Sequence, residues 1–180
     1  MKLQTDRLTM RNVLITDLEA IHALNSIPEV DQYNTLGIPD SIKDTRELIE
    51  KRIIENQQRE VQNYTWVILD KSSEEFIGMI GMMLDNKKYN RGEVWYKIHP
   101  VHWNKGFATE AMKEIIHFGF ETLHLHRIQA GCAVDNIASI RVLEKVGMTR
   151  EGRGRKVLPL KSGWSDNFEY SILDDDPRVE

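Results

Sequence analysis

The stretch that decides the fold is Trp103-Asn104-Lys105-Gly106-Phe107-Ala108-Thr109-Glu110-Ala111. Helical periodicity begins near Gly106, directly after a strand-like run of residues 93–98. The N-terminus of a helix leaves backbone N–H groups unpaired and carries partial positive charge, and small residues let a ligand approach those groups closely. This arrangement is typical of a pyrophosphate-binding turn, with Lys105 adding a full positive charge. The same small residues are also compatible with simple close packing of the helix against a sheet.

The sequence lacks the common alternative patterns for binding nucleotide phosphates. It contains no Gly-x-x-x-x-Gly-Lys-Ser/Thr run, which would cradle the phosphates of ATP or GTP. It also has no Gly-x-Gly-x-x-Gly run opening an N-terminal strand–helix unit, as a dinucleotide site would require. These ligand classes are therefore disfavoured.

Hydrophobic periodicity on both sides of the turn predicts alternating strands and helices. The expected strands are residues 8–13, 64–69, 76–84, 93–98, 127–134, 149–160 and 164–173. A capping box formed by Thr16 and Glu19 predicts the start of the first helix, and a loop is expected at residues 28–39. Further helices are expected after Ser41, from near Gly106 and at residues 137–146. Short connections within residues 64–98 favour an antiparallel meander, and segment 93–134 favours a parallel crossover. The predicted fold class is α/β (α+β), a mixed, mostly antiparallel sheet of about seven strands flanked by about four helices.

Length and composition limit the classes of protein. The 180 residues, 41% of them hydrophobic, predict a single domain at residues 1–173 and an acidic C-terminal tail at 174–180. With 24 basic and 28 acidic residues the net charge is -4, so no nucleic-acid partner is expected. No secretory signal or long apolar run is present, which predicts a cytoplasmic protein without a membrane partner. Cys132 is the only cysteine and is expected to be a small buried hydrophobe.

A second informative segment is residues 134–148, where Asn136 follows a strand and precedes a helix. Its side chain is well placed to accept N–H bonds at the helix start, and Gly147 suits the left-handed conformation that ends many helices. Taken alone, the segment predicts only a well-capped helix.

Together, several stretches resemble the GNAT acetyltransferase superfamily, specifically its ribosomal-protein N-terminal acetyltransferase (RimJ/RimL)-like branch. The stretches that carry the resemblance are residues 5–11, residues 93–96 with Pro100, residues 103–111 and residues 136–148. They span nearly the whole chain, in the order and spacing of the family.

The resemblance implies a sheet that is split between its fourth and fifth strands, here residues 93–98 and 127–134, with the pantetheine arm of acetyl-CoA in the split. Backbone groups around Ile98 would pair with the pantetheine, and Asn136 would contact it from the other side. Amides of residues 104–109 would hold the pyrophosphate. The implied cofactor-binding set is Ile98, Trp103, Asn104, Lys105, Gly106, Phe107, Ala108, Thr109, Asn136 and Ser139.

The sequence departs from the family pattern at several positions. Asn104 stands where this branch often has Gly, and Trp103 stands where many GNAT proteins have Gln or Arg. Neither change removes a backbone donor. Leu143 replaces the tyrosine thought to protonate the departing thiolate in many members of the superfamily. In this branch a serine at the position of Ser139 lies near the sulfur, which makes Ser139 the replacement candidate.

The implied activity is transfer of an acetyl group from acetyl-CoA to a primary amine, a protein N-terminus or a small amine, directly in a ternary complex. An alkylammonium has a pKa of about 10.4, so a base must assist near neutral pH. Glu93 is the candidate base, because partial burial beside the split would strengthen it. The simpler interpretations are that Glu93 is a solvated surface residue and that Ser139 only stabilises the start of its helix. A backbone N–H near Ile98 is expected to bind the oxyanion.

The alternative function is a non-catalytic acyl-CoA-binding sensor or interaction module, which would keep residues 103–109 but lack a working base. No metal site is expected, because the histidines near the turn and before residue 127 lack a third ligand at a recognisable spacing; they are His99, His102, His124 and His126. The protein is expected to be a monomer or a homodimer.

Overall fold

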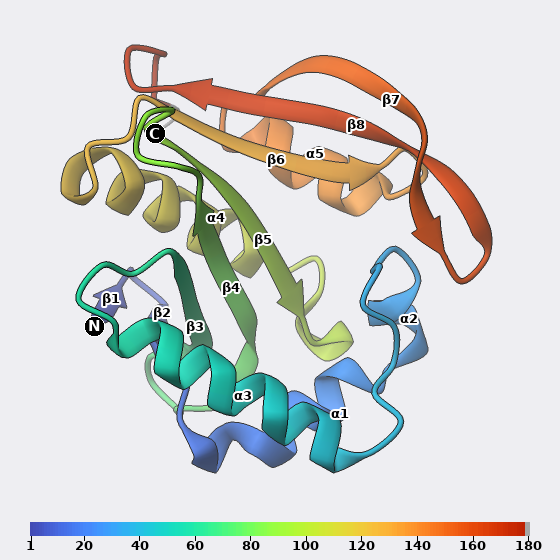
Figure 1. Ribbon diagram of the computed structural model, residues 1–180. Helices are drawn as coiled ribbons and strands as arrows, with labels where there is room; N and C mark the ends of the chain where they lie inside the picture. Colours follow the sequence, from blue (N-terminus) through green and yellow to red (C-terminus); the bar gives the residue numbers. More distant parts are fainter. Residues whose placement is uncertain (179–180) are drawn as a thin grey trace.

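A mixed sheet forms the centre of the computed structural model, which describes residues 1–178 (Figure 1). Its strand order is β1-β2-β3-β4-β5-β6-β8-β7. The strands are β1 (Lys2–Gln4), β2 (Leu8–Asn12), β3 (Asn63–Asp70), β4 (Phe76–Leu84), β5 (Arg91–Ile98), β6 (Arg127–Ala133), β7 (Thr149–Leu160) and β8 (Gly163–Leu173). The helices are α1 (Leu18–Asn25), α2 (Pro28–Asp31), α3 (Ile42–Gln57), α4 (Phe107–His117) and α5 (Ile137–Lys145).

The predicted fold class is confirmed, including the meander and the parallel crossover. Strands β3, β4 and β5 pair antiparallel in sequence order because short turns join them. The pair β5–β6 is parallel, and α4 makes the connection between these strands. On the far side β6, β8 and β7 pair antiparallel again. The sheet therefore consists of two antiparallel halves joined at β5 and β6.

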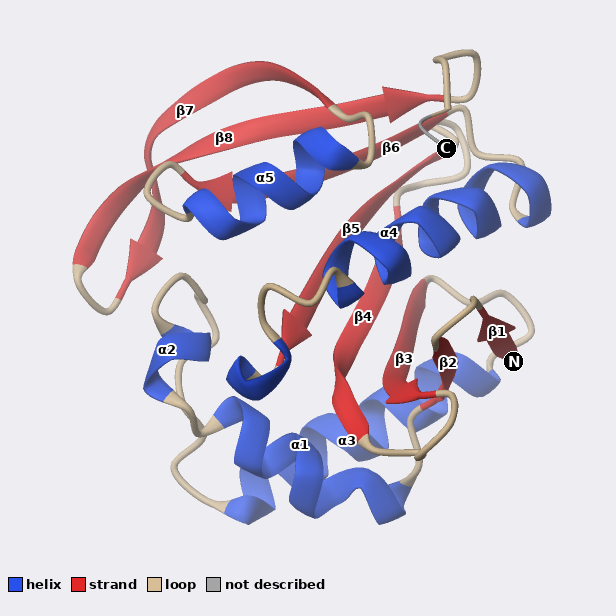
Figure 2. Cartoon of the chain, turned by 180° about the vertical axis from the view of Figure 1, so that it is seen from behind, coloured by secondary structure: helices blue, strands red, loops and turns tan. Residues whose placement is uncertain are grey.

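Alternation along the strands divides the apolar side chains between the two faces of the sheet. On one face, Val67 and Met79 pack with Ile21 of α1 and Ile49 of α3. On the other face, a larger cluster gathers around Met112 and neighbouring residues of α4. Figure 2 shows α5 over β6 and α4 beside β4 and β5. Helices thus cover both faces of the N-terminal half.

The structure differs from the sequence prediction near the N-terminus. The predicted capping box of Thr16 and Glu19 is wrong: the carboxylate of Asp17 accepts the backbone N–H of Leu14 at 2.8 Å, and α1 follows a 3-10 turn. Arg11 of β2 also donates to both oxygens of Asp17, each at 2.8 Å. Asp17 is therefore committed to an ion pair as well as to the start of the helix.

Two short elements add to the predicted set. Strand β1 raises the strand number to eight, and α2 forms within the expected loop at residues 28–39. A helix of one turn with Pro28 at its first position is too short to show periodicity in the sequence. Val179 and Glu180, the end of the expected acidic tail, lie outside the described residues. Within residues 1–178, no helix is long and apolar enough to cross a membrane.

Candidate active site

The central feature of the site is the separation of β5 from β6 (Figure 1). The two strands pair in register only from Arg91 with Arg127 to Glu93 with Gln129. Beyond that point, residues 94–98 of β5 have no paired partner on β6 within the described chain. The expected split therefore lies between the expected strands, with its closed end at Glu93.

Backbone direction shows which groups face the split. The N–H of His99 donates to Ile77 of β4 at 2.8 Å. Since successive residues of a strand turn their N–H and C=O groups to opposite edges, Tyr96 and Ile98 direct theirs toward β6. The carbonyl of Ile98 accepts the indole N–H of Trp103 at 2.7 Å. The N–H of Ile98 is therefore the group that this residue can offer to a ligand in the split.

The turn after β5 presents an exposed helix N-terminus. Asn104 and Gly106 both have left-handed backbones, with φ of 59° and 82°. Gly106 occupies the N-cap position of α4, and no side chain of the described residues caps it. Left-handed and right-handed residues in succession turn their N–H groups toward a common point, which forms an anion-binding nest. The residues with the expected cofactor role, 103–109, thus surround free backbone donors.

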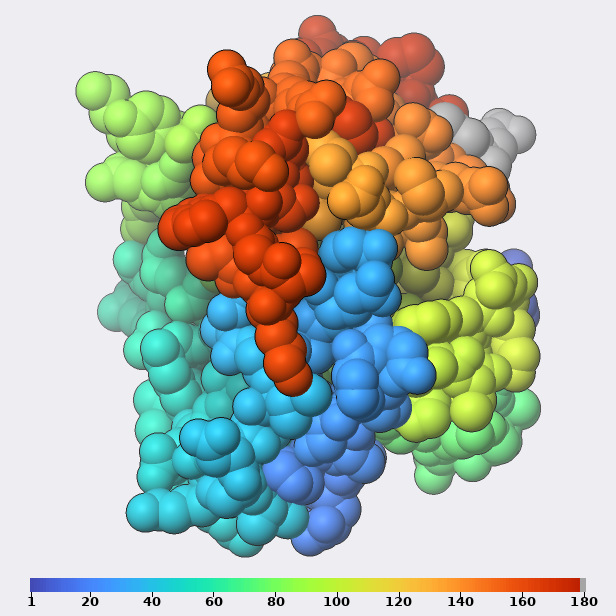
Figure 3. All heavy atoms as spheres, turned by 90° about the vertical axis from the view of Figure 1, so that its right-hand side faces the viewer, coloured from blue at the N-terminus to red at the C-terminus, as the bar shows by residue number. Residues whose placement is uncertain are grey.

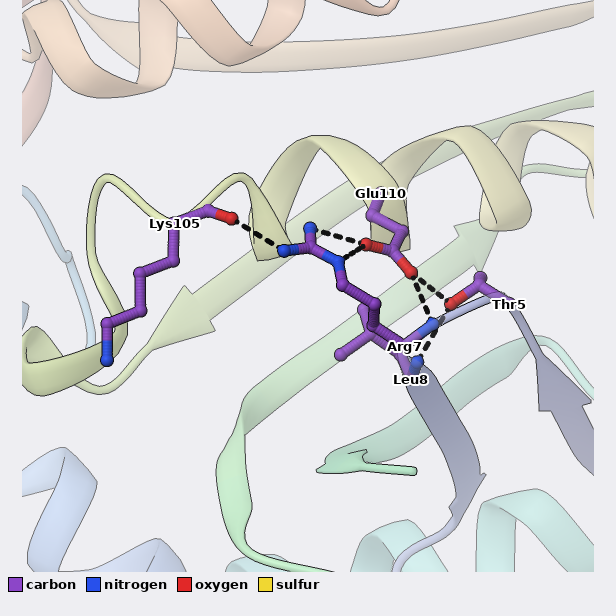
Figure 4. Close-up of polar contacts among 5 residues, drawn as sticks. All are labelled: Thr5, Arg7, Leu8, Lys105 and Glu110. Atoms are coloured by element: carbon purple, nitrogen blue, oxygen red, sulfur yellow. Dashed lines mark hydrogen bonds and ion pairs between the residues drawn. The ribbon is translucent and has the colours of Figure 1, made fainter. Parts of the chain in front are cut away.

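A set of contacts that we call the clasp joins this turn to the N-terminal strands (Figure 4). The guanidinium of Arg7 donates to the carboxylate of Glu110 at 2.6 Å and to the carbonyl of Lys105 at 3.0 Å. The backbone N–H of Arg7 and the hydroxyl of Thr5 donate to the other oxygen of Glu110, at 3.0 and 2.5 Å. The guanidinium also lies 4.6 Å from the centre of the Phe107 ring. The clasp therefore connects the segment between β1 and β2 to the first turn of α4.

Burial would raise the pKa of Glu110, but the hydrogen bonds from Thr5 and Arg7 and the charge of Arg7 outweigh it, so the pKa lies below its ordinary value. The carboxylate is accordingly ionised and neutralised by Arg7 near neutral pH. This matters because Glu110 lies in the first turn of α4, beside the free N–H groups, where an uncompensated negative charge would repel a phosphate.

A second cluster of polar side chains lies across the split, where α5 begins after β6. The side chain of Asn136 accepts the backbone N–H of Ser139 at 3.1 Å, which is the predicted cap of α5. The hydroxyl of Ser139 is 2.9 Å from the hydroxyl of Tyr96 on β5. Burial raises the pKa of Tyr96 to about 12, and the hydrogen bond with Ser139 offsets part of that rise. Tyr96 therefore stays protonated and brings a hydroxyl from β5 to Ser139.

Glu93 lies on the opposite face of the sheet from Tyr96, because side chains alternate along β5. The expectation of partial burial is wrong, since Glu93 is exposed. The physical reason is the position of α1, which covers only the end of the strand: Lys97 donates to Asn25 of α1 at 2.8 Å. The amide of Gln129 is 3.5 Å from the carboxylate of Glu93, at the limit of a hydrogen bond.

A groove lies on this same side of the molecule, between α2 and the β7–β8 hairpin. Figure 3 shows the tip of that hairpin extending over the segment that contains α2. The groove has a volume of about 450 Å³, and its lining residues are Pro28, Glu29, Gln32, Lys161 and Ser162. The lining carries charged groups of both signs.

Residues 7–149 match the family model described as the acetyltransferase (GNAT) domain. The chain belongs to the GNAT acetyltransferase family. Among its relatives, the uncharacterized N-acetyltransferase YoaA of Bacillus subtilis is 36% identical over 171 residues, which cover 95% of this chain and 96% of that protein. The prediction of the GNAT superfamily is confirmed, and the protein is an acyltransferase. Its place in the ribosomal-protein branch stays a prediction.

Solved structures extend this likeness to GNAT proteins with known ligands. A GNAT acetyltransferase from Bacillus anthracis has a TM-score of 0.86 at 30% identity, covering 98% of this chain and 100% of that one. Spermidine N-acetyltransferase from Vibrio cholerae, solved in complex with CoA and spermine, has a TM-score of 0.84 at 26% identity, covering 94% of this chain and 97% of that one. The ribosomal-protein-S5-alanine acetyltransferase from Vibrio fischeri, at 20% identity, shares the fold.

Sequence reasoning missed part of this GNAT site. It named Ser139 and the turn, and the structure brings both to the split. It did not assign Arg7, Glu110 or Tyr96, whose contacts join residues far apart in the chain. The only available signal for Arg7 was the resemblance of residues 5–11 to the family opening.

Cys132 on β6 gives a direct test of how well this part of the GNAT fold is shielded from solvent. Burial raises the pKa of its thiol to about 11, so only about one thiol in a thousand is ionised at pH 8. We expect 5,5′-dithiobis(2-nitrobenzoate) to label Cys132 far more slowly in the native protein than in urea. Equal labelling rates, followed by absorbance at constant pH, would contradict the buried position.

Proposed function

We propose that this GNAT protein transfers an acetyl group from acetyl-CoA to a primary amine by direct attack in a ternary complex. The observation that carries the proposal is the split between β5 and β6, which leads to the uncapped N-terminus of α4. The CoA complex of the Vibrio cholerae relative supports the choice of donor. We assign the acetyltransferase domain to residues 1–173 and the tail to 174–180, in a cytoplasmic monomer or homodimer.

The geometry fits the groups of CoA that need partners. The pyrophosphate would be held by backbone N–H groups of residues 104–109, with Lys105 and the dipole of α4 opposing its charge. The pantetheine would lie in the split, where Ile98 offers its N–H from β5 and Asn136 lies on the other side. Trp103 would act indirectly, by holding the carbonyl of Ile98.

Chemistry would take place where the split narrows toward its closed end. Glu93 would accept a proton from the attacking amine through a chain of water molecules, while a backbone N–H near Ile98, that of Tyr96, stabilises the oxyanion. When the carbon–sulfur bond breaks, the sulfur leaves with the electron pair and Ser139 donates a hydrogen bond to it. An amine that arrives as an ammonium loses two protons, one before attack and one as the amide forms. One of these protons neutralises the thiolate through solvent and the other passes to solvent, so each turnover releases one proton.

Tyr96 would hold Ser139 in place for this role. A phenol with a pKa near 12 is too weak an acid to protonate a thiolate, whose ordinary pKa is about 8.5, but it donates a hydrogen bond well. If Tyr96 donates to Ser139, the hydroxyl proton of Ser139 is free to point at the sulfur. The pair would then stabilise the leaving group without changing its own protonation state.

Replacing Ser139 with alanine is expected to lower kcat by about tenfold, because a hydrogen bond to a charged group contributes about 1.5–3 kcal/mol. The Kd for CoA should stay within about twofold of the wild-type value. Tyr96→Phe should give a smaller fall in kcat, and adding it to Ser139→Ala should have little further effect. Unchanged kcat for Ser139→Ala at saturating acetyl-CoA would remove Ser139 from the mechanism.

For the acceptor, we propose a primary amine that enters from the side of α1 and α2, where Glu93 is exposed. Glu29 in the groove beside α2 would attract its ammonium group. A relative named spermidine N(1)-acetyltransferase, 27% identical over 81% of this chain, supports a small polyamine. The resemblance to the ribosomal-protein branch supports a protein N-terminus as the second candidate acceptor.

The decisive experiment is a thiol-release screen with acetyl-CoA against polyamines, aminoglycosides, amino acids and N-terminal peptides. We expect release with at least one primary amine and an acetylated product of matching mass. CoA binding by calorimetry without thiol release from any acceptor would instead indicate the non-catalytic module. Comparing spermidine with an N-terminal peptide at equal concentration then decides between the acceptor classes.

A further inference from the structure

The turn before α4 has a shape that the chain must maintain. Asn104 and Gly106 both lie in the left-handed region, and Asn104 is not a glycine. Such conformations persist only where surrounding contacts determine them. Lys105 lies between the two, and its carbonyl accepts the guanidinium N–H of Arg7 at 3.0 Å. The clasp therefore holds the turn at its midpoint (Figure 4).

We propose that Arg7 is a positioning residue for the donor's pyrophosphate, acting through the turn at residues 104–106. This inference rests on the proposed function, because it assigns the turn to the donor. Arg7 performs two tasks at once: it fixes the carbonyl of Lys105 and neutralises Glu110 in the first turn of α4. The first keeps the neighbouring N–H groups directed at the ligand, and the second removes a repulsive charge.

The guanidinium geometry is essential to both tasks. The planar group of Arg7 directs one nitrogen to Lys105 and two others to Glu110, at distances between 2.6 and 3.0 Å. A lysine ammonium is a point charge that cannot span the two acceptors with the same geometry. Thr5, directly after β1, supports the arrangement by donating to the same carboxylate.

The test compares Arg7→Lys and Arg7→Gln with the wild-type protein, using a full donor and a truncated donor. Calorimetry gives the Kd for CoA, and thiol release gives kcat/KM for acetyl-CoA and for S-acetylpantetheine, which lacks the pyrophosphate. We expect both variants to bind CoA about tenfold more weakly and to lose about tenfold in kcat/KM for acetyl-CoA. Their kcat at saturating acetyl-CoA and their kcat/KM for S-acetylpantetheine should stay within about twofold of wild type.

Arg11→Lys is the matched control, because Arg11 lies on β2, the strand that follows Arg7, and also makes a forked contact with a carboxylate, that of Asp17. It should lower the Tm without changing the Kd for CoA. Unchanged CoA affinity in both Arg7 variants, or equal losses with both donors, would overturn the inference. If the wild-type protein releases no thiol, the proposed function is contradicted instead. In that case the calorimetric Kd values still decide whether CoA binding depends on Arg7.

Discussion

Replacing Glu93 with glutamine should lower kcat by about a hundredfold, the lower end of the usual contribution of a general base. The substitution keeps the size of the side chain and its contact with Gln129, and it removes only the ability to accept a proton. The Kd for CoA should not change, because Glu93 lies on the face of β5 opposite Tyr96. The measurement is kcat between about pH 6 and pH 9 with the best amine from the screen.

Glu50→Gln provides the control for the loss of one negative charge, since Glu50 is exposed on α3 and contacts no part of the split. Its pH profile should follow that of the wild-type protein. If kcat of Glu93→Gln also follows the wild-type profile at every pH, Glu93 is a solvated surface residue and the base lies elsewhere. A higher KM for the amine with unchanged kcat would mean that the glutamine changes acceptor binding rather than proton transfer.

Gly106→Val is the second substitution with a large expected effect. A side chain is strained at φ of 82°, and a Cβ on Gly106 would lie 3.4 Å from a guanidinium nitrogen of Arg7. A branched side chain would push the turn away from the clasp and cover the free N–H groups of α4. We expect CoA to bind about thirtyfold more weakly, which corresponds to about 2 kcal/mol.

Gly37→Val separates backbone strain from the effect on the ligand. Gly37 has φ of 78°, and no atom of residues 1–178 beyond its chain neighbours lies within 4 Å of a Cβ at this position. Both variants should therefore lose about 1–2 kcal/mol of folding free energy, measured by urea denaturation, from the left-handed conformation alone. Only Gly106→Val should weaken CoA binding, and equal Kd values for the two variants would argue against binding at the turn.

The antiparallel meander could be predicted from the sequence because its determinants are local. The strands within residues 64–98 are short, largely apolar runs, and short polar connections separate them. The ends of α5 were also predictable, since Asn136 and Gly147 have the residue types that cap helices, and the structure places them there. Strand β1 and helix α2 were missed because three or four residues are too few to establish a period.

The split itself could not be derived from the residues of β5. Residues 94–98 form a largely apolar run like that of an ordinary strand. The loss of pairing with β6 depends on how the two halves of the sheet diverge. Only the resemblance to the family indicated it. Burial of Glu93 was wrongly predicted for a related reason, because the exposure of a strand residue depends on which helix packs over it.

The clasp shows a further limit of sequence reasoning. Arg7 and Glu110 are separated by 103 positions, and each looks like an ordinary surface residue in its own segment. Their contact depends on the pairing of β2 within the sheet and on the placement of α4 beside it. No local pattern encodes such a pair.

The unpaired edges of β5 and β6 have a consequence for what the donor does structurally. A sheet edge inside a protein normally requires another strand, because its N–H and C=O groups need partners. The pantetheine arm of CoA contains amide groups of the same kind. In the proposed complex it would lie where an additional strand would otherwise run, so the substrate would complete the secondary structure of the enzyme that consumes it.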